Sequence, residues 1–145
     1  MNKLFNTPHL FFFGLVPVFI LISFFRSDAS FDINFQNTYF VVAIPYLCYL
    51  SAAFFALVGV NYYVLHWAKK PHKRALTSIH ITLQIASLLF FVYFMFSIPG
   101  NGNVETPYPS SIDENSLFVV SFILFLIATI LHFVNFIMSL LAKRE

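Results

Sequence analysis

Four long stretches of the chain are almost entirely apolar, and polar residues gather in the segments between them. The stretches are 4–25, 38–67, 75–98 and 116–141. A helix needs about 20 apolar residues to cross roughly 30 Å of hydrocarbon, so each stretch is long enough to span a bilayer. None shows the long polar face of a helix that lies on a membrane surface. The pattern therefore predicts an all-α protein, with residues 1–145 forming a single four-helix transmembrane domain.

The connections between the stretches are those expected for antiparallel neighbours. The segment KKPHKR, Lys69–Arg74, is very short, whereas Pro99–Asn115 is rich in turn-forming and acidic residues. Short connections make an up-down arrangement the default for four helices, so we expect an up-down bundle. The first stretch is longer than the apolar core of a secretory signal peptide, and we expect it to remain as a span.

The basic residues lie on one side of this predicted topology. With four spans, both termini and the Lys69–Arg74 connection face the same side, and together they carry seven of the eight Lys and Arg residues. The opposite side carries Arg26 and five of the six acidic residues. Because cytoplasmic connections of membrane proteins are enriched in Lys and Arg, we expect both termini in the cytoplasm, with the chain in a bacterial inner membrane.

Composition narrows the classes of function. Hydrophobic residues make up 59% of the chain and charged residues 10%, whereas about 25% charge is usual for a soluble domain. The one cysteine, Cys48, excludes an intrachain disulfide and a metal site made of cysteines alone. The sequence has no glycine-rich phosphate loop and no HExxH or GxSxG motif. We therefore expect no enzymatic activity, and partners that are lipids and membrane proteins rather than nucleic acid.

One segment around the start of the second stretch has a distinctive order of residues. It reads QNTYFVVAIPY over 36–46. Small and aromatic residues continue the frame downstream, at Ala52, Ala53, Phe55, Ala56 and Gly59. This frame resembles subunit I of the haem-copper oxidases, the cytochrome c and quinol oxidases. The following helices and loop come in the family's order, so the resemblance implies that the chain corresponds to the last four helices of that subunit.

The resemblance breaks at the family's metal ligands. Ile44 and Tyr46 stand where the family has the two histidines that bind the haem irons. Gln36 and Asn37 stand where the family has a His-Asp pair near its magnesium site. Pro45 lacks a backbone donor and is expected either to kink the helix or to reset its start. The resemblance therefore implies a retained scaffold without oxygen reduction, and we expect neither a metal nor a cofactor.

Polar side chains inside the third and fourth stretches are the remaining candidates for chemistry, because such groups are costly inside a membrane. They include His80, Gln84, His132 and Asn135. With residues 75 and 141 taken as level cytoplasmic ends, we expect interhelical hydrogen bonds from His80 to Asn135 and from Gln84 to His132. Two alternatives stay open, a haem b bound by His80 and His132 and a proton relay. The two histidines would differ in depth by about 6 Å, which argues against their binding one haem.

Small residues on the second stretch indicate a packing surface. Ala52, Ala56 and Gly59 share one helix face, and this pattern lets helices approach closely, either within the bundle or between chains. Near the end of the same stretch, Tyr62 and Tyr63 are typical of the aromatic belt at a membrane–water interface.

These observations favour a non-catalytic accessory subunit of a membrane complex, with a respiratory complex as one candidate. Self-assembly, for example as a homotrimer, would use the same surfaces. A small haem-binding electron-transfer protein that uses His80 and His132 is the first alternative, and a proton or solute pathway in an oligomer is the second.

Overall fold

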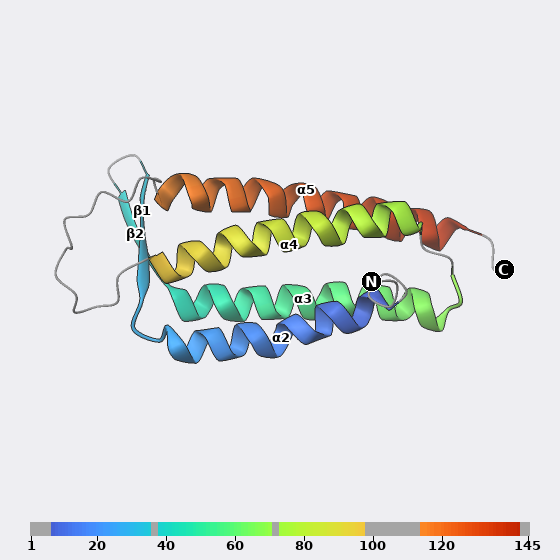
Figure 1. Ribbon diagram of the computed structural model, residues 1–145, viewed down its shortest axis with the longest axis horizontal. Coiled ribbons are helices and arrows are strands. Elements are labelled where there is room, and N and C mark those ends of the chain that lie inside the picture. Colours follow the sequence, from blue (N-terminus) through green and yellow to red (C-terminus); the bar gives the residue numbers. More distant parts are fainter. Residues whose placement is uncertain (1–6, 36–37, 71–72, 98–113, 143–145) are drawn as a thin grey trace.

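Four long helices make up most of the molecule. The computed structural model describes residues 7–35, 38–70, 73–97 and 114–142. The helices are α2 (Pro8–Phe25), α3 (Ile44–Trp67), α4 (Arg74–Ser97) and α5 (Glu114–Leu141), and they lie side by side along the long axis (Figure 1). All four are long and apolar enough to cross a membrane. This confirms four helices of membrane-spanning length and indicates an integral membrane protein.

The sequence predicts an all-α fold, but the structure also contains two short strands. A two-stranded antiparallel hairpin, β1 (Ser30–Phe35) and β2 (Thr38–Ala43), lies at one end of the molecule and leads into α3 (Figure 1). The prediction that a helix begins at residue 38 is therefore wrong for the first six residues, which pair with β1 from Phe35↔Thr38 to Ser30↔Ala43. The β2 sequence TYFVVA is rich in the β-branched and aromatic residues that favour strands.

Pro45 explains why α3 starts where it does. The helix begins at Ile44 and holds Pro45 in its first turn, where the missing N–H has no intrahelical acceptor to lose. The preceding residue, Ala43, is extended, with φ −68° and ψ 133°. Of the two effects expected of Pro45, the reset of the helix start is the one that occurs.

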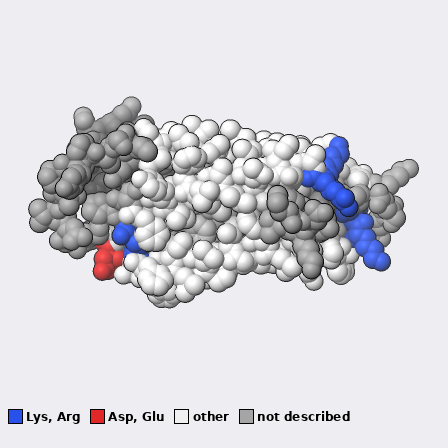
Figure 2. All heavy atoms as spheres, viewed as in Figure 1, with Lys and Arg blue, Asp and Glu red and all other residues white. Residues whose placement is uncertain are grey.

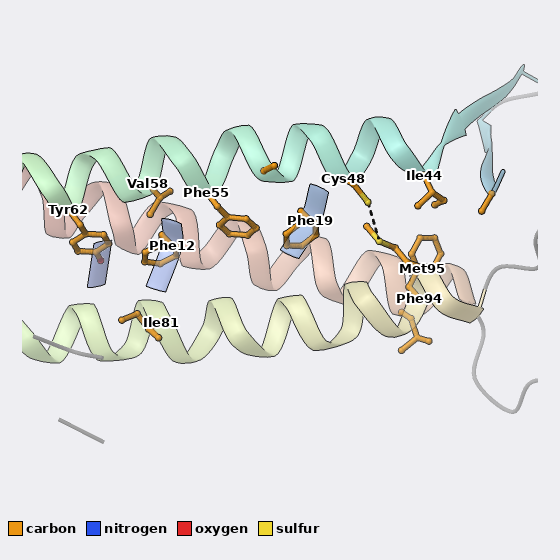
Figure 3. Packing of buried hydrophobic residues seen from close by; sticks show 13 residues of the cluster. Phe12, Phe19, Ile44, Cys48, Phe55, Val58, Tyr62, Ile81, Phe94 and Met95 are labelled. Carbon is orange, nitrogen blue, oxygen red and sulfur yellow. Dashed lines mark hydrogen bonds between the residues drawn. The ribbon is translucent and has the colours of Figure 1, made fainter. Parts of the chain in front are cut away.

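The helices pack as two pairs, α2 with α3 and α4 with α5, and the pairs meet mainly through side chains. Aromatic rings fill the space between the pairs. In Figure 3 the rings of Tyr62, Phe12, Phe55 and Phe19 follow one another between α3 and α4. The Phe12 ring centroid lies 5.6 Å from that of Tyr62 and 6.2 Å from that of Phe55. The core of the molecule is therefore the seam between the two helix pairs.

The outer surface is apolar along the helices. Large side chains such as Leu50, Leu57, Leu89 and Ile130 are exposed. On the face shown in Figure 2, the described charged side chains lie near the two ends of the molecule, with Lys and Arg gathered at one of them. An apolar surface of this extent is unfavourable in water and suits hydrocarbon, so its environment is a lipid bilayer.

The basic connection after α3 forms a defined helix end. Lys69 has a left-handed φ of 53°, and the N–H of Lys70 donates to the Leu65 carbonyl at 3.0 Å, as in a Schellman motif. The Lys70 ammonium donates to the carbonyls of Leu140 and Ala142, both at 2.6 Å. A cation is favourable at a helix C-terminus, so Lys70 ties the end of α3 to the end of α5.

Replacing Lys69 with glycine is expected to stabilise the protein by about 0.5–1 kcal/mol, because glycine adopts a left-handed φ without a strained Cβ. Lys69→Ala removes the same charge but keeps a Cβ, and it should give no gain. Unfolding can be followed through Cys48, the one thiol of the chain, which is fully buried and becomes reactive toward a fluorescent thiol reagent when the fold opens. Equal thiol-labelling rates for the two variants would contradict the strain argument.

Candidate functional site

Candidate chemistry gathers where α4 and α5 meet and border the seam between the helix pairs. The side-chain amide of Asn135 donates to Thr77 Oγ1 at 2.9 Å, which sets the level of one helix against the other. Three residues further along each helix come His80 and His132, whose ring centroids are 5.0 Å apart. The two histidines therefore lie at the same depth.

The hydrogen-bonded pairs differ from those predicted from the sequence. The predicted pairs, His80 with Asn135 and Gln84 with His132, assume that residues 75 and 141 are level. Lys70 lies before α4 begins and still reaches the last carbonyls of α5, so α5 extends about one helical turn beyond the start of α4. The antiparallel register shifts by that turn, and the predicted 6 Å difference in depth between the histidines is wrong.

Partners for the histidines come from α3. The Tyr62 hydroxyl lies 2.9 Å from His80 Nδ1, and Asn61 Nδ2 lies 3.2 Å from His132 Nε2. Because an amide nitrogen only donates, His132 Nε2 accepts, and in the neutral ring the proton sits on Nδ1. From α2, the Phe12 ring stacks on His80 with 5.2 Å between centroids. All four helices thus meet at the two histidines.

We call this group the polar cluster, and its members are Asn61, Tyr62, Thr77, His80, Gln84, His132 and Asn135. Sequence reasoning missed Tyr62, which it assigned to the membrane–water interface together with Tyr63. Tyr62 is 2% exposed, whereas Tyr63 is 50% exposed. The signal was the spacing: Tyr62 follows the buried Phe55 by two helical turns and therefore shares its face.

The polar cluster, as folded, does not fit a haem between its two histidines. Axial ligands of one iron lie on opposite faces of the porphyrin, and metal–nitrogen bonds of about 2 Å each put the ring centroids roughly 6 Å apart. The rings of His80 and His132 are only 5.0 Å apart and inclined by 31°. Phe12 and Tyr62 also stack on His80. A haem would require α4 to move away from α5, and the rings of Phe12 and Tyr62 to leave His80.

The residues that the predicted resemblance places at the oxidase ligand positions differ in their surroundings. Ile44 is fully buried at the start of α3, and Tyr46 is 72% exposed on its outer side. Gln36 and Asn37 lie outside the described residues. Within the described parts of the chain, no group of three or more His, Cys, Asp or Glu side chains could hold a metal ion.

The small residues of α3 contribute to packing inside this chain. Ala52 is buried and Ala56 half-buried. A Cβ built on Gly59 would lie 2.9 Å from Cδ1 and Cε1 of the Phe13 ring. At Gly59, therefore, the close approach is between α2 and α3, the first of the two arrangements that the sequence leaves open.

Replacing Tyr62 with phenylalanine is expected to destabilise the fold by about 1 kcal/mol, because the ring stays in place while His80 Nδ1 loses its partner. Tyr63→Phe makes the same change at the next position, where the side chain is half-exposed, and should have almost no effect. Thermal unfolding followed by Cys48 labelling compares the two variants. Equal unfolding midpoints would show that the hydroxyl of Tyr62 contributes nothing to the seam.

In three comparisons with known proteins, no family model, no curated protein and no solved structure matches the chain. The resemblance to haem-copper oxidase subunit I therefore stays a prediction from the sequence.

Proposed function

We propose that the chain is a non-catalytic membrane protein that acts by associating with other membrane subunits, such as those of a respiratory complex, or with copies of itself. The observation that carries this proposal is the burial of the polar cluster. His80, Gln84, His132 and Asn135 are at most 1% exposed. The groups that could perform chemistry therefore face one another inside the seam, where hydrogen bonds between membrane helices typically contribute about 0.6 kcal/mol each. The apolar outer surface is left for lipids and neighbouring helices.

The proposed arrangement in the bilayer is an up-down bundle with both termini in the cytoplasm. Its support is the distribution of charge. Lys69, Lys70, Lys73 and Arg74 lie where α3 ends and α4 begins, whereas Arg26 and Asp28 follow the end of α2 at the opposite end of the helices. Figure 2 shows Lys and Arg side chains gathered at one end of the molecule. Cytoplasmic ends of membrane helices are enriched in Lys and Arg. The contact of Lys70 with the end of α5 supports the same assignment for the C-terminus.

The scaffold that we propose is that of the last four helices of haem-copper oxidase subunit I. The support is the segment QNTYFVVAIPY and the order of helices and loops after it. An isoleucine side chain offers no donor atom to iron, and Tyr46 points away from the core. We therefore propose that the chain keeps the family's scaffold and has a structural role without the family's redox chemistry.

Purification in mild detergent, followed by native mass spectrometry and identification of co-purifying proteins, tests the association. The expected result is either a stoichiometric complex with other membrane subunits or a homo-oligomer, with the trimer as the leading candidate. A chain that remains monomeric and partner-free in several detergents and in lipid nanodiscs would contradict the proposal. An absorption spectrum after haem supplementation belongs to the same experiment. A haem band that disappears in His80→Ala or His132→Ala would favour a function in electron transfer over the proposed function in association.

A proton pathway is a second candidate, and the geometry of the seam gives it one specific support. The ring centroids of His80 and His132 lie 5.0 Å apart at one depth. Tyr62 is hydrogen-bonded to His80, and Asn61 to His132. Reconstitution in vesicles with an enclosed pH-sensitive dye tests it. Proton flux that falls in His132→Ala would support the pathway, and flux no greater than that of empty vesicles would exclude it.

A further inference from the structure

The polar cluster holds more hydrogen-bonding groups than the described residues satisfy. Five buried side-chain atoms have no partner among them: His80 Nε2, Gln84 Nε2, Gln84 Oε1, His132 Nδ1 and Asn135 Oδ1. The four side chains that carry these atoms are all at least nine-tenths buried, with exposures of 0 or 1%. They lie near one another, because His80 lies against His132, Gln84 follows His80 by one turn of α4, and Asn135 follows His132 by one turn of α5.

Unsatisfied groups in this number are too costly to be left without a ligand. Each buried donor or acceptor without a partner costs about 1–3 kcal/mol, and the total stability of a domain is only about 5–15 kcal/mol. Hydrocarbon surrounds the seam, so bulk water cannot satisfy these atoms as it does at a protein surface. Something polar must therefore lie among them.

The chemistry of the cluster favours a neutral ligand over a metal ion. No Asp or Glu lies within the four spans, so a divalent ion would bring its whole charge into the membrane interior, where ionic groups without partners are strongly disfavoured. The free atoms include both kinds of group. His132 Nδ1–H and Gln84 Nε2 donate, whereas Gln84 Oε1 and Asn135 Oδ1 accept. A ligand that satisfies both kinds must itself donate and accept.

The register of α4 and α5 also places a small side chain level with Gln84. Thr77 faces Asn135, and two turns further along each helix Gln84 comes level with Ala128, which is fully buried. The methyl group of Ala128 is smaller than the leucine or phenylalanine side chains found elsewhere along α5. Buried water occupies such sites when two to four polar groups surround it.

We propose that the polar cluster binds internal water, one or more molecules that bridge His80 Nε2, His132 Nδ1, the Gln84 amide and Asn135 Oδ1. The water joins α4 to α5 at the level where Tyr62 and Asn61 join both helices to α3. This inference requires that the polar cluster is buried and that the helices lie in a bilayer. It does not depend on which partner the protein binds.

Solid-state NMR of the wild-type protein in lipid bilayers tests this directly. With ¹⁵N-labelled histidine, magnetisation transferred from water protons should reach His80 Nε2 and His132 Nδ1 at a rate similar to that for the exposed His66 ring. Phe94, which is fully buried in the apolar part of the seam, serves as the dry reference in a ¹³C-labelled sample. Transfer to the two histidines as slow as to Phe94 would overturn the proposal.

The variant Gln84→Met gives a second test with opposite expected signs. Methionine has a similar shape without the amide, so in a dry cluster it would remove two unsatisfied atoms and slow Cys48 labelling. In a hydrated cluster it removes two partners of the water, and we expect labelling to become about three- to tenfold faster. Ser87→Ala is the control for loss of a polar group on α4, since Ser87 Oγ donates to a protein carbonyl, that of Ser121. Slower labelling in Gln84→Met would overturn the proposal, as would a stoichiometric metal ion that is lost in His132→Ala.

Discussion

Phe12→Ala is expected to be the most destabilising single substitution in the core, with a loss of about 2–4 kcal/mol. Phe12 is fully buried, and its ring stacks on Phe55, Tyr62 and His80, so it links α2 to α3 and to α4. Inside a membrane the gain from removing apolar surface from water is small, because the separated helices are already in lipid. The cavity term remains, since packed neighbours collapse only in part around a missing ring.

The matched control is Phe24→Ala, the same change on the same helix at a position that is 69% exposed. That side chain faces lipid, which fills the space left by the ring, so the control should change stability by less than about 0.5 kcal/mol. Thermal unfolding in nanodiscs, followed by the labelling rate of Cys48, measures both variants. If Phe12→Ala and Phe24→Ala shift the midpoint equally, the seam between the helix pairs is not the packed core described above.

Gly59→Leu is expected to cost about 1–3 kcal/mol, the second-largest effect. The first carbon of any side chain at this position would lie 2.9 Å from the Phe13 ring, so α2 must move away from α3 or the ring must leave its place. Gly14→Leu is the control, because nothing lies within 4 Å of a Cβ at Gly14. Both substitutions replace a helical glycine, and the gain in helix propensity therefore cancels in the comparison.

The result also separates the two roles open to the small face of Ala52, Ala56 and Gly59. Loss of stability in the monomer is the outcome expected from packing between α2 and α3. A Gly59→Leu variant that keeps its unfolding midpoint but loses its oligomeric state in native mass spectrometry would contradict that packing. It would instead assign the face to contacts between chains.

The helices follow from the sequence because hydrocarbon imposes a strong constraint on length and polarity. Apolar length alone identified the four spans that α2 to α5 form. The β-hairpin escaped prediction because TYFVVA is as apolar as a span, and hydropathy does not distinguish a strand from the first turns of a helix. Pro45 carried the missing information, since a helix that starts at Ile44 leaves the preceding residues free to pair with β1.

The register of the polar cluster was harder to predict for a different reason. Side-chain depth depends on where each helix ends, and helix ends are the least certain part of a sequence-based prediction. An error of one turn was enough to exchange the partners of His80 and Asn135. The sequence did indicate that these residues seek partners on a neighbouring helix, because amides and imidazoles in a span avoid lipid. Their contacts with Asn61 and Tyr62 depend on how α3 packs, which no single helix encodes.

Accessibility of single cysteines from the two sides of the membrane tests the central claim, a four-helix bundle with its basic end in the cytoplasm. Cys48 is first replaced by alanine, and one cysteine is then introduced at Lys73 or at Asp28, which lie at opposite ends of the helices. An impermeant thiol reagent is applied to right-side-out and to inverted membrane vesicles. Lys73→Cys should react only in inverted vesicles and Asp28→Cys only in right-side-out vesicles. Reaction of both positions from the same side, or the reverse pattern, would contradict the account.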